Sequence, residues 1–469
     1  MDTKRRLSFL GIAVLLAGLV TTITVVKQSQ TLQQHAASDT SFHVTRIGKI
    51  IGSRGPTFVT TSMSTRQDPS TITVLNDTFR GVTASDLGAM TAYKGKLYFN
   101  LGDTAQTSTS PSNPDFIRSV VPFSSDTNFA DGITLENYLP CAPEDTNCTP
   151  TKVINGNYPL PNAMFSINWQ GQEYMFSQYM EHKSGGGHDL TIHYSAIAKY
   201  DEGSRQFTRY KENVYTWPGD WQHFGMASFW VDYSTQYLYM IGSPAGRLGG
   251  AKLARIPLST FMDTGNMSGW EYFLGSSQWS GPTQDKNTIL SAAWLIPPKS
   301  PDWSINKDWT QLSYDEKCRA VTISEFSVIY NPYLQKFVLI TGRPCETNSN
   351  GGVFFYTADN IMGPWSNELL LLANQTEGGI NYQYYGTYTT DALLRNNGQT
   401  MYFVATNWTT YGIYLYKVDF STLAPTIAPS PTPLPTNVPT VPQPTLTPTT
   451  PPPPTITRVP TRIPTVTPG

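Results

Sequence analysis

Two aspartates stand at matching ends of a short hairpin-like stretch between Ala84 and Thr107. The pattern predicts strands at 88–93 and 96–101, joined by a tight Lys-Gly turn. Asp86 comes just before the first strand, and Asp103 comes just after the second. Because the two strands of a hairpin are antiparallel and similar in length, the start of the first lies beside the end of the second. We therefore expect both carboxylates at the same end of one sheet.

Paired carboxylates at the mouth of an aromatic-lined fold are typical of glycoside hydrolases. One acid protonates the leaving oxygen, and the other activates water or attacks the sugar. Asp86 and Asp103 are the expected pair, and Glu325 is a third acid that could act as general acid or hold substrate hydroxyls. The structural alternative is that Asp86 caps a turn and that Asp103 forms an Asx turn at the end of its strand.

Three basic residues are candidates for contacts with substrate. His223 could tune a carboxylate, contact substrate or bind a central ion, and a buried histidine with satisfied hydrogen bonds is an equal alternative. Arg118, expected on a third strand, and Arg247, in a glycine-rich loop, could bind substrate oxygens or pair with the acids. Ion pairs at the surface remain comparable roles for both arginines.

Motifs of other enzyme classes are missing from the sequence. It has no serine nucleophile elbow, no phosphate-binding Gly-Lys-Ser loop, no His-Glu-x-x-His pair and no zinc-type Cys-x-x-Cys spacing. We therefore expect no cofactor and no metal site, and we leave open a calcium ion on the axis of the fold.

Five similar hairpins recur along the chain and must position these residues. After the first, they span 163–178, 224–242, 325–342 and 386–406, and most are followed by further strand-like runs. This pattern predicts an all-β fold, a five-bladed β-propeller, and disfavours a large β-sandwich. An early strand at 43–51 would supply the outer strand that closes the ring. The first strand of each blade would line the axis, starting at Asp86, Asn162, His223, Glu325 and Tyr385.

The two ends of the chain differ in composition from the propeller. Three basic residues precede an uncharged run, Leu7–Val26, which predicts a transmembrane anchor or a signal helix. We expect an anchor segment at 1–27, a polar stalk at 28–42, the propeller at 43–423 and a disordered Pro/Thr-rich tail at 424–469. The basic flank would place the propeller on the extracellular face of the membrane, or outside the cell if the segment is cleaved.

Charge and cysteine content narrow the range of partners. The net charge of −2 and the charged fraction of 14% argue against nucleic-acid binding. A chain with abundant Tyr, Phe and Trp fits a polysaccharide partner, although we expect most of these rings to fill the core. We expect a monomer. In an oxidising compartment, Cys141 could pair with Cys148 and Cys318 with Cys345, or all four could stay reduced.

Several motifs together resemble the domain-of-unknown-function family 4185. These are SDLG, LGDT, FIRSVVPFSSDTNFADGI, AGRLGGAKLARIPL, EFSVIYNP and TADNIMGPW, which lie between Gly81 and Phe420. Part of that family is grouped with glycoside hydrolases that act as endo-D-arabinanases on mycobacterial-type arabinan. The resemblance implies a five-bladed propeller in which Asp86 and Asp103 are the catalytic acids. The chain departs from the family pattern at Leu101, where Phe is expected, and at Val120, where Asn is expected.

These observations lead to one functional hypothesis and two alternatives. The hypothesis is an exported glycoside hydrolase acting on a furanosidic polysaccharide such as arabinan. The alternatives are a non-catalytic carbohydrate-binding or cell-surface propeller and a structural envelope protein.

Overall fold

A computed structural model gives the fold of the central part of the chain. It describes residues 42–51, 59–60, 63–64, 74–76, 81–106, 117–156, 158–182, 192–215, 224–244, 249–264, 267–299, 322–343, 351–377, 380–407 and 410–421. The predicted anchor and tail, and nearly all of the predicted stalk, lie outside these residues and stay predictions. In the described ranges, no helix combines the length and the apolar composition that a bilayer crossing requires.

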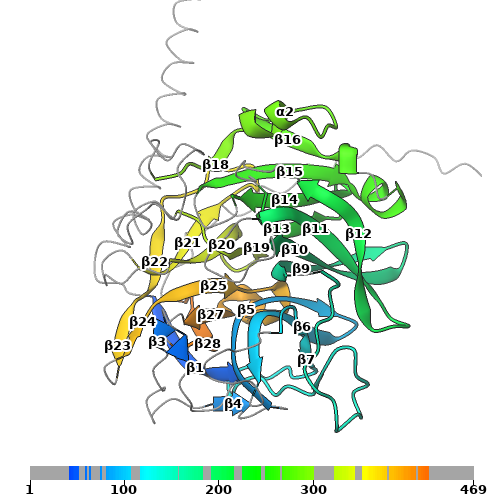
Figure 1. Ribbon diagram of the computed structural model, residues 1–469. Helices are drawn as coiled ribbons and strands as arrows, with labels where there is room; N and C mark the ends of the chain where they lie inside the picture. The colour runs from blue at the N-terminus through cyan, green and yellow to red at the C-terminus, as the bar shows by residue number, and fades with distance from the viewer. Residues whose placement is uncertain are drawn as a thin grey trace, which may run out of the picture. The chain divides into compact units, whose positions relative to one another are not determined.

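Five sheets surround a common axis, as Figure 1 shows, and confirm the five-bladed propeller. All their described strand pairs are antiparallel except β1 (His43–Ile51) with β4 (Val74–Asn76) in blade 5. Blade 1 consists of β5 (Val82–Tyr93), β6 (Lys96–Gln106), β7 (Pro122–Ser124) and β8 (Asn137–Tyr138). Blade 2 consists of β9 (Pro159–Trp169), β10 (Gln172–His182), β11 (Ile192–Asp201) and β12 (Gln206–Tyr215). Blade 3 consists of β13 (Met226–Asp232), β14 (Tyr237–Ser243), β15 (Ala251–Pro257), β16 (Glu271–Gly275), β17 (Gln278–Trp279) and β18 (Trp294–Ile296).

The remaining blades complete the ring. Blade 4 consists of β19 (Phe326–Asn331), β20 (Lys336–Arg343), β21 (Gly352–Ala358) and β22 (Leu369–Ala373). Blade 5 consists of β25 (Tyr384–Tyr388), β26 (Leu394–Arg395), β27 (Thr400–Asn407), β28 (Gly412–Asp419), β1 (His43–Ile51) and β4 (Val74–Asn76). Two small ribbons are β2 (Val59–Thr60) with β3 (Met63–Ser64), and β23 (Gln375–Glu377) with β24 (Ile380–Tyr382).

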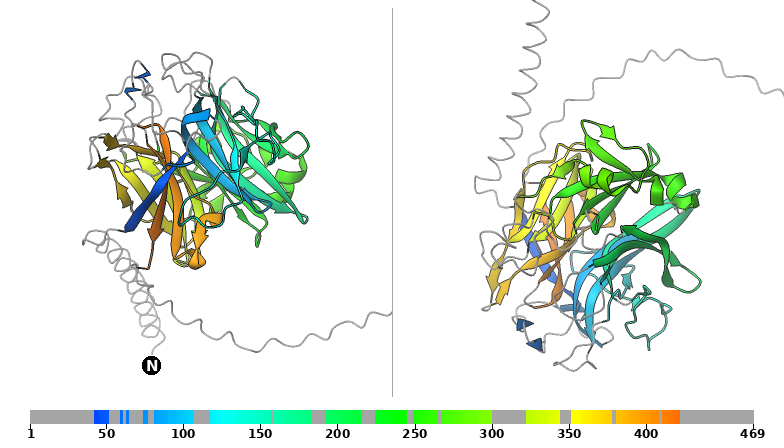
Figure 2. Two further views of the ribbon diagram at one scale, coloured as in Figure 1. Left: turned by 90° about the horizontal axis from the view of Figure 1, so that it is seen from below. Right: turned by 45° about the horizontal axis from the view of Figure 1, so that its top comes forward.

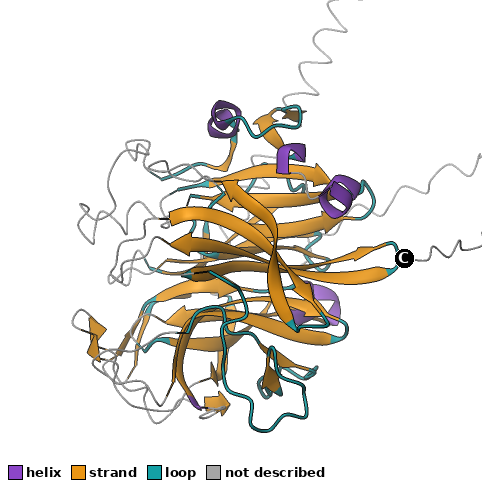
Figure 3. Ribbon diagram, turned by 45° about the vertical axis from the view of Figure 1, so that its right-hand side comes forward, coloured by secondary structure: helices purple, strands orange, loops and turns teal. Residues whose placement is uncertain are grey.

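Helices contribute only short segments between the described strands (Figure 3). They are η2 (Thr260–Thr264), η3 (Met267–Gly269), α2 (Lys286–Ser291), η5 (Asp391–Leu393) and η6 (Asn396–Gly398). The innermost strands β5, β9, β13, β19 and β25 contact one another in turn around the axis. Side chains on these five strands can therefore meet even though they lie far apart in the sequence.

The ring closes by pairing the start of the chain with its last strand. Strand β1 runs antiparallel to β28, with His43 opposite Asp419 and Lys49 opposite Tyr414. Figure 2 shows the blue β1 beside the orange strands of blade 5. The predicted closing strand is confirmed. Blade 5 therefore combines strands from the start and from the end of the propeller sequence.

Aromatic rings from neighbouring blades pack against each other in the core. Phe165 of blade 2 stacks on Phe229 of blade 3, with ring centroids 4.1 Å apart. Trp230 of blade 3 meets Phe337 of blade 4 edge-on at 4.9 Å. Pairs of this kind are worth about 0.5–1.5 kcal/mol each beyond their buried area. At these two junctions, aromatic rings from neighbouring blades fill the core, the role expected for most of them.

Cys141 and Cys148 form a disulfide in blade 1. The other predicted pair, Cys318 with Cys345, lies outside the described residues.

Candidate active site

The first hairpin is longer than the sequence pattern predicted, so both aspartates lie within its strands. Asp86 is part of β5, and Asp103 is part of β6. The prediction that they flank the strands was wrong because the ladder continues past irregularities in register around Ser85, Leu87 and Ala89. Such bulges add residues to one strand and redirect its side chains. The expected placement at one end of the sheet still holds, since β6 runs back alongside β5.

Backbone geometry fixes the position of Asp86. The next two residues, Leu87 and Gly88, have φ of 63° and 106°, a combination that a regular strand does not adopt. Across the hairpin, Gly102 leaves space for the carboxylate, since a Cβ there would lie 2.2 Å from Asp86 Oδ1. The bulge and the missing side chain together let the Asp86 carboxylate sit in a protein-lined site, where the residue is only 8% exposed.

Three donors hold the Asp86 carboxylate. The backbone N–H of Asp103 donates to Oδ1 at 2.6 Å. The hydroxyls of Tyr385 and Tyr411, both from blade 5, donate to Oδ2 at 3.0 and 3.1 Å. The site is therefore built across the junction between the first and last blades of the ring.

Asp103 has a cation as its partner. Arg118 Nε lies 2.9 Å from Asp103 Oδ1, and both side chains are 19% exposed. The Arg118 guanidinium also stacks on the ring of Tyr158, 3.3 Å from its centroid. Arg118 does not lie on a third strand as predicted. It lies in a segment joined to β6 by single bridges, Thr104 with Ile117 and Leu101 with Val120, just before β7.

The second of these bridges joins the two positions that depart from the family pattern. Leu101 N–H donates to Val120 O at 2.8 Å, and Val120 N–H donates back at 3.3 Å. Both side chains are buried, at 2% and 0% exposure. The two departures are therefore paired through their backbones, and both side chains belong to the same hydrophobic cluster.

The two carboxyl groups differ in their electrostatic surroundings. Burial, together with the nearby charge of Asp103, raises the pKa of Asp86 to about 8, although its three hydrogen bonds oppose the shift. Burial also raises the pKa of Asp103, but Arg118 and a hydrogen bond from Tyr411 oppose that rise. The member of an acid pair that lacks a cation is the one that keeps the proton. At neutral pH this arrangement favours a protonated Asp86 beside an ionised Asp103.

Tyr411 is a residue that the sequence analysis missed. It is buried, it adopts φ of 48°, and its hydroxyl hydrogen-bonds both aspartates. Its backbone oxygen accepts the N–H of Ser85 at 3.2 Å, which anchors it to the bulge. The one local signal is a Tyr-Gly pair ahead of the last strand, which does not indicate a role at an acid site more than 300 residues away in sequence.

Glu325 lies just before β19 and is 5% exposed. Its Oε2 accepts the Ser324 hydroxyl and, at 3.4 Å, the N–H of Gly386. Gly386 follows Tyr385 directly, so Glu325 fixes the backbone that carries one of the donors to Asp86. The predicted third acid thus supports blade 5 at the site.

Glu181 is a buried carboxylate that the sequence analysis also missed. It lies in β10, is 4% exposed, and its Oε1 accepts the N–H of Tyr158 at 2.8 Å. It therefore holds the segment whose ring stacks on Arg118. Glu181 would have been hard to find, because nothing in its local sequence links it to blade 1.

Two predicted residues, His223 and Arg247, lie outside the described residues, so their proposed contacts stay predictions. Across the described ranges, no group of three or more His, Cys, Asp or Glu side chains is placed to hold a metal ion.

Comparisons with solved structures give several similar chains. A provisionally assigned hydrolase from Bacteroides ovatus has a TM-score of 0.49 at 14% identity, covering 75% of this chain and 89% of its own. Exo-β-1,3-galactanase from Phanerochaete chrysosporium has a TM-score of 0.40 at 12% identity, with coverages of 73% and 62%. Bacillus subtilis arabinanase has a TM-score of 0.35 at 12% identity, with coverages of 73% and 97%. Similarities this distant say nothing about shared chemistry.

The search of curated proteins finds no match. A family model does match, over residues 75–417, which includes the whole acid site and four of the five blades in full. The chain therefore belongs to the family described as Domain of unknown function (DUF4185).

Proposed function

We propose that this chain is a glycoside hydrolase that cleaves a furanosidic polysaccharide, with D-arabinan as the first polymer to test. The observation that carries the proposal is the unequal pair of buried acids: Asp103 pairs with Arg118, whereas no ion pair of Asp86 is found among the residues that the structure describes. Glycoside hydrolysis needs one protonated and one ionised carboxyl group at the same time. The choice of arabinan follows from the family resemblance.

In this mechanism, Asp86 is the general acid. Its raised pKa keeps a proton available at neutral pH, and that proton passes to the glycosidic oxygen as the bond to the anomeric carbon breaks. Asp103 stays ionised beside Arg118 and serves the other half of the reaction, as base toward water or as nucleophile toward the anomeric carbon. Arg118, Tyr158 and Glu181 act as positioning residues for Asp103. Arg118 pairs with Asp103 and stacks on the ring of Tyr158, and Glu181 accepts the backbone N–H of Tyr158.

Reducing-sugar release from D-arabinan, L-arabinan and galactan tests the proposal. We expect release from a furanosidic polymer, and we expect Asp86→Asn and Asp103→Asn each to lower kcat by about 10²–10⁴-fold. Asp359→Asn is the matched control, because its side chain is 84% exposed and lies in blade 4 beside Lys336. Undiminished release by the Asp103→Asn protein would refute the catalytic assignment. Binding of these polymers without any release would favour the non-catalytic alternative.

We further propose that the propeller works outside the cell membrane, held by the apolar segment Leu7–Val26. Fractionation of intact cells, followed by protease digestion from outside, checks this placement. We expect the propeller to stay with the membrane fraction and to be cut by the external protease. Recovery in the cytosolic fraction would contradict it.

A further inference from the structure

A pocket lies on the propeller axis, beyond the acid site, and it opens where the innermost strands end. It encloses about 200 Å³ and is lined by residues of all five innermost strands, or of the segments that follow them. On β5 the lining residues are Met90 and Thr91, four and five positions after Asp86. Its rim includes Tyr233, which is 48% exposed, and the exposed Asp391. We call this cavity the turn-end pocket.

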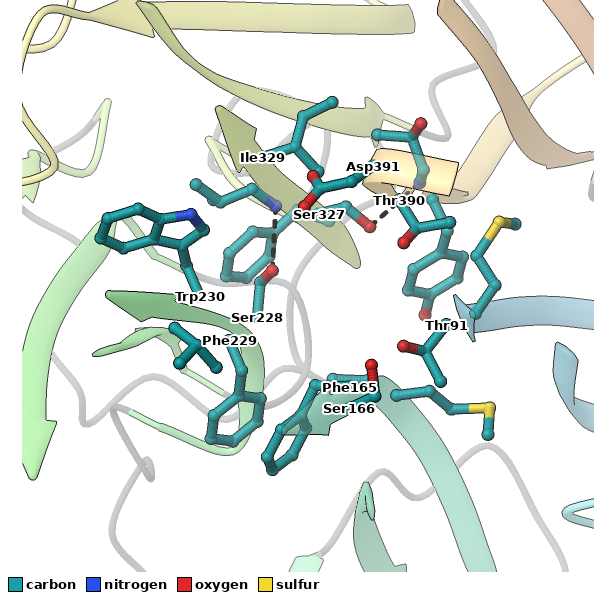
Figure 4. A pocket seen from close by; sticks show the side chains of 18 of the residues that line it. Thr91, Phe165, Ser166, Ser228, Phe229, Trp230, Ser327, Ile329, Thr390 and Asp391 are labelled. Carbon is teal, nitrogen blue, oxygen red and sulfur yellow. Dashed lines mark hydrogen bonds between the residues drawn. The ribbon is translucent and has the colours of Figure 1, made fainter. Parts of the chain in front are cut away.

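The polar lining of the turn-end pocket consists mainly of uncharged groups. Figure 4 shows the hydroxyls of Thr91, Ser166, Ser228, Ser327 and Thr390 around the same central space. Among the twenty described lining residues none is Lys, Arg or His, and Asp391 is the one acid. A phosphate or carboxylate ligand would meet no cation among these residues, so the described lining disfavours anions.

Several of these groups keep hydrogen-bonding capacity for a ligand. Ser228 Oγ accepts the N–H of Val328 at 2.9 Å, and Ser327 Oγ accepts the N–H of Thr389 at 3.1 Å. Neither serine donates its own hydrogen to another described residue, and both are more than nine-tenths buried. Asn162 Oδ1, on a side chain 2% exposed, accepts no hydrogen bond from the described residues. Buried polar groups of this kind normally have a partner, so they indicate a bound water or a polar ligand.

Aromatic rings line parts of the same space. Phe165 and Phe229 are stacked on each other, and the half-buried Trp230, the next residue of β13, lines another part of the wall (Figure 4). Trp230 is held edge-on against Phe337 at 4.9 Å, so its ring is ordered before any ligand arrives. Flat apolar faces beside converging hydroxyl donors and acceptors match the two sides of a sugar ring, its C–H face and its hydroxyl edge.

We propose that the turn-end pocket binds a single neutral sugar ring, separately from the acid site. Its volume is below the range of about 300–1,000 Å³ that is usual for drug-sized ligands, which favours one ring over an oligosaccharide. A free monosaccharide and the terminal residue of a glycan chain offer the same chemistry. This site does not depend on hydrolysis at Asp86 and Asp103, and it would stand if the chain proved inactive.

Saturation-transfer NMR on the full chain tests this site. The probes are D-arabinose, D-galactose and D-glucose for the free sugar, and their methyl glycosides for the chain end. The Asp103→Asn protein serves as background, so that no probe is consumed. We expect millimolar binding of at least one probe. Tighter binding of the methyl glycoside would identify a chain end as the ligand, and tighter binding of the free sugar would identify a monosaccharide.

Variants of the lining residues test whether the probes bind in the turn-end pocket. Trp230→Ala should weaken it at least tenfold, and Ser166→Phe, which fills the cavity, should abolish it. Tyr330→Ala is the matched control, because Tyr330 is 38% exposed and follows the lining residue Ile329 without lining the pocket itself. Near-UV circular dichroism checks that each variant is folded. The absence of saturation with all probes would overturn the proposal. So would full binding by a folded Ser166→Phe protein, or preferential binding of glucose 6-phosphate.

Discussion

The acid site and the turn-end pocket differ in the chemistry of their side chains, although β5 contributes residues to both. At the acid site, two buried aspartates share the hydroxyl of Tyr411, and one of them faces Arg118. At the turn-end pocket the lining is hydroxyl, amide and aromatic, with a single acid at the rim. The two sites share strand β5, which carries Asp86 at one and Met90 and Thr91 at the other, so the difference arises from individual side chains and from local backbone geometry.

The two sites can be compared by the free-energy cost of burying their carboxyl groups. Burying a carboxylate is unfavourable unless it is paired, hydrogen-bonded or protonated. The acid site shows all three solutions, since Asp103 has a cation, Asp86 has three donors, and the pKa of Asp86 is raised. In the turn-end pocket the one acid among the described lining residues is Asp391, and desolvation raises its pKa as well. The role that we propose for the pocket is binding, and the role that we propose for the acid site is proton transfer.

The acid site should make the stability of the protein depend on pH. The folded pKa of Asp86, about 8, is above its unfolded value of 3.8, so the folded chain holds the proton more tightly. The stability from this group is complete below about pH 4 and is lost as the pH rises toward 8. That loss is at most about 6 kcal/mol, since the pKa differs by about four units and one unit corresponds to about 1.4 kcal/mol.

Urea unfolding of the wild type and of Asp86→Asn at pH 4 to 8 measures this effect. The uncharged amide should remove most of the decline in unfolding free energy. An identical pH dependence in both proteins would mean that Asp86 is ionised over the whole pH range. That result would contradict a protonated Asp86 at the acid site.

Gly102→Ala should disrupt the acid site by steric overlap alone. The new Cβ would lie 2.2 Å from Asp86 Oδ1 and 2.7 Å from Leu87 Cδ1, so the bulge must shift. We expect a loss of about 1–3 kcal/mol in unfolding free energy, together with a large fall in hydrolysis. Gly281→Ala is the matched control, because no atom lies within 4 Å of its added Cβ. Wild-type hydrolysis by Gly102→Ala would show that the carboxylate need not occupy this position.

Tyr411→Phe should have the smallest effect of the three, with a distinctive signature. It removes a hydrogen bond that lowers the pKa of both aspartates, so both limbs of the pH–activity profile should move to higher pH. Activity at neutral pH should fall by about 10- to 100-fold, as expected for a hydrogen bond to a charged group. Tyr330→Phe, on the exposed surface, is the control. A fall in activity with both limbs unmoved would indicate a purely structural role.

The sequence pattern was sufficient to predict the fold because the paired strands of each hairpin are close together in the sequence. Every hairpin contains its own turn and alternation, and the closing strand at 43–51 stands out as an extra strand-like run. In the first turn, Lys94 and Gly95 both have positive φ, as the predicted tight hairpin requires. The same local signals also placed Asp86 and Asp103 on one hairpin.

The other residues of the acid site could not be predicted from their local sequence. Tyr411 and Tyr385 reach Asp86 only because blade 5 closes against blade 1, and Glu181 reaches Tyr158 from a neighbouring strand of blade 2. The bulge at Leu87 depends on a positive φ that nothing in the side chain of leucine favours. Contacts made by ring closure leave no periodic signal in a single sequence.

Direct titration of the Asp86 carboxyl group tests the central claim that the two buried acids hold opposite protonation states. The carboxyl carbons of aspartate can be labelled with ¹³C, and the Asp86→Asn protein identifies the Asp86 signal by its loss. We predict that the signal titrates near pH 8 and that Asp86 is protonated at neutral pH while Asp103 is ionised. Titration of Asp86 near pH 4, the ordinary value for a solvated aspartate, would contradict the account.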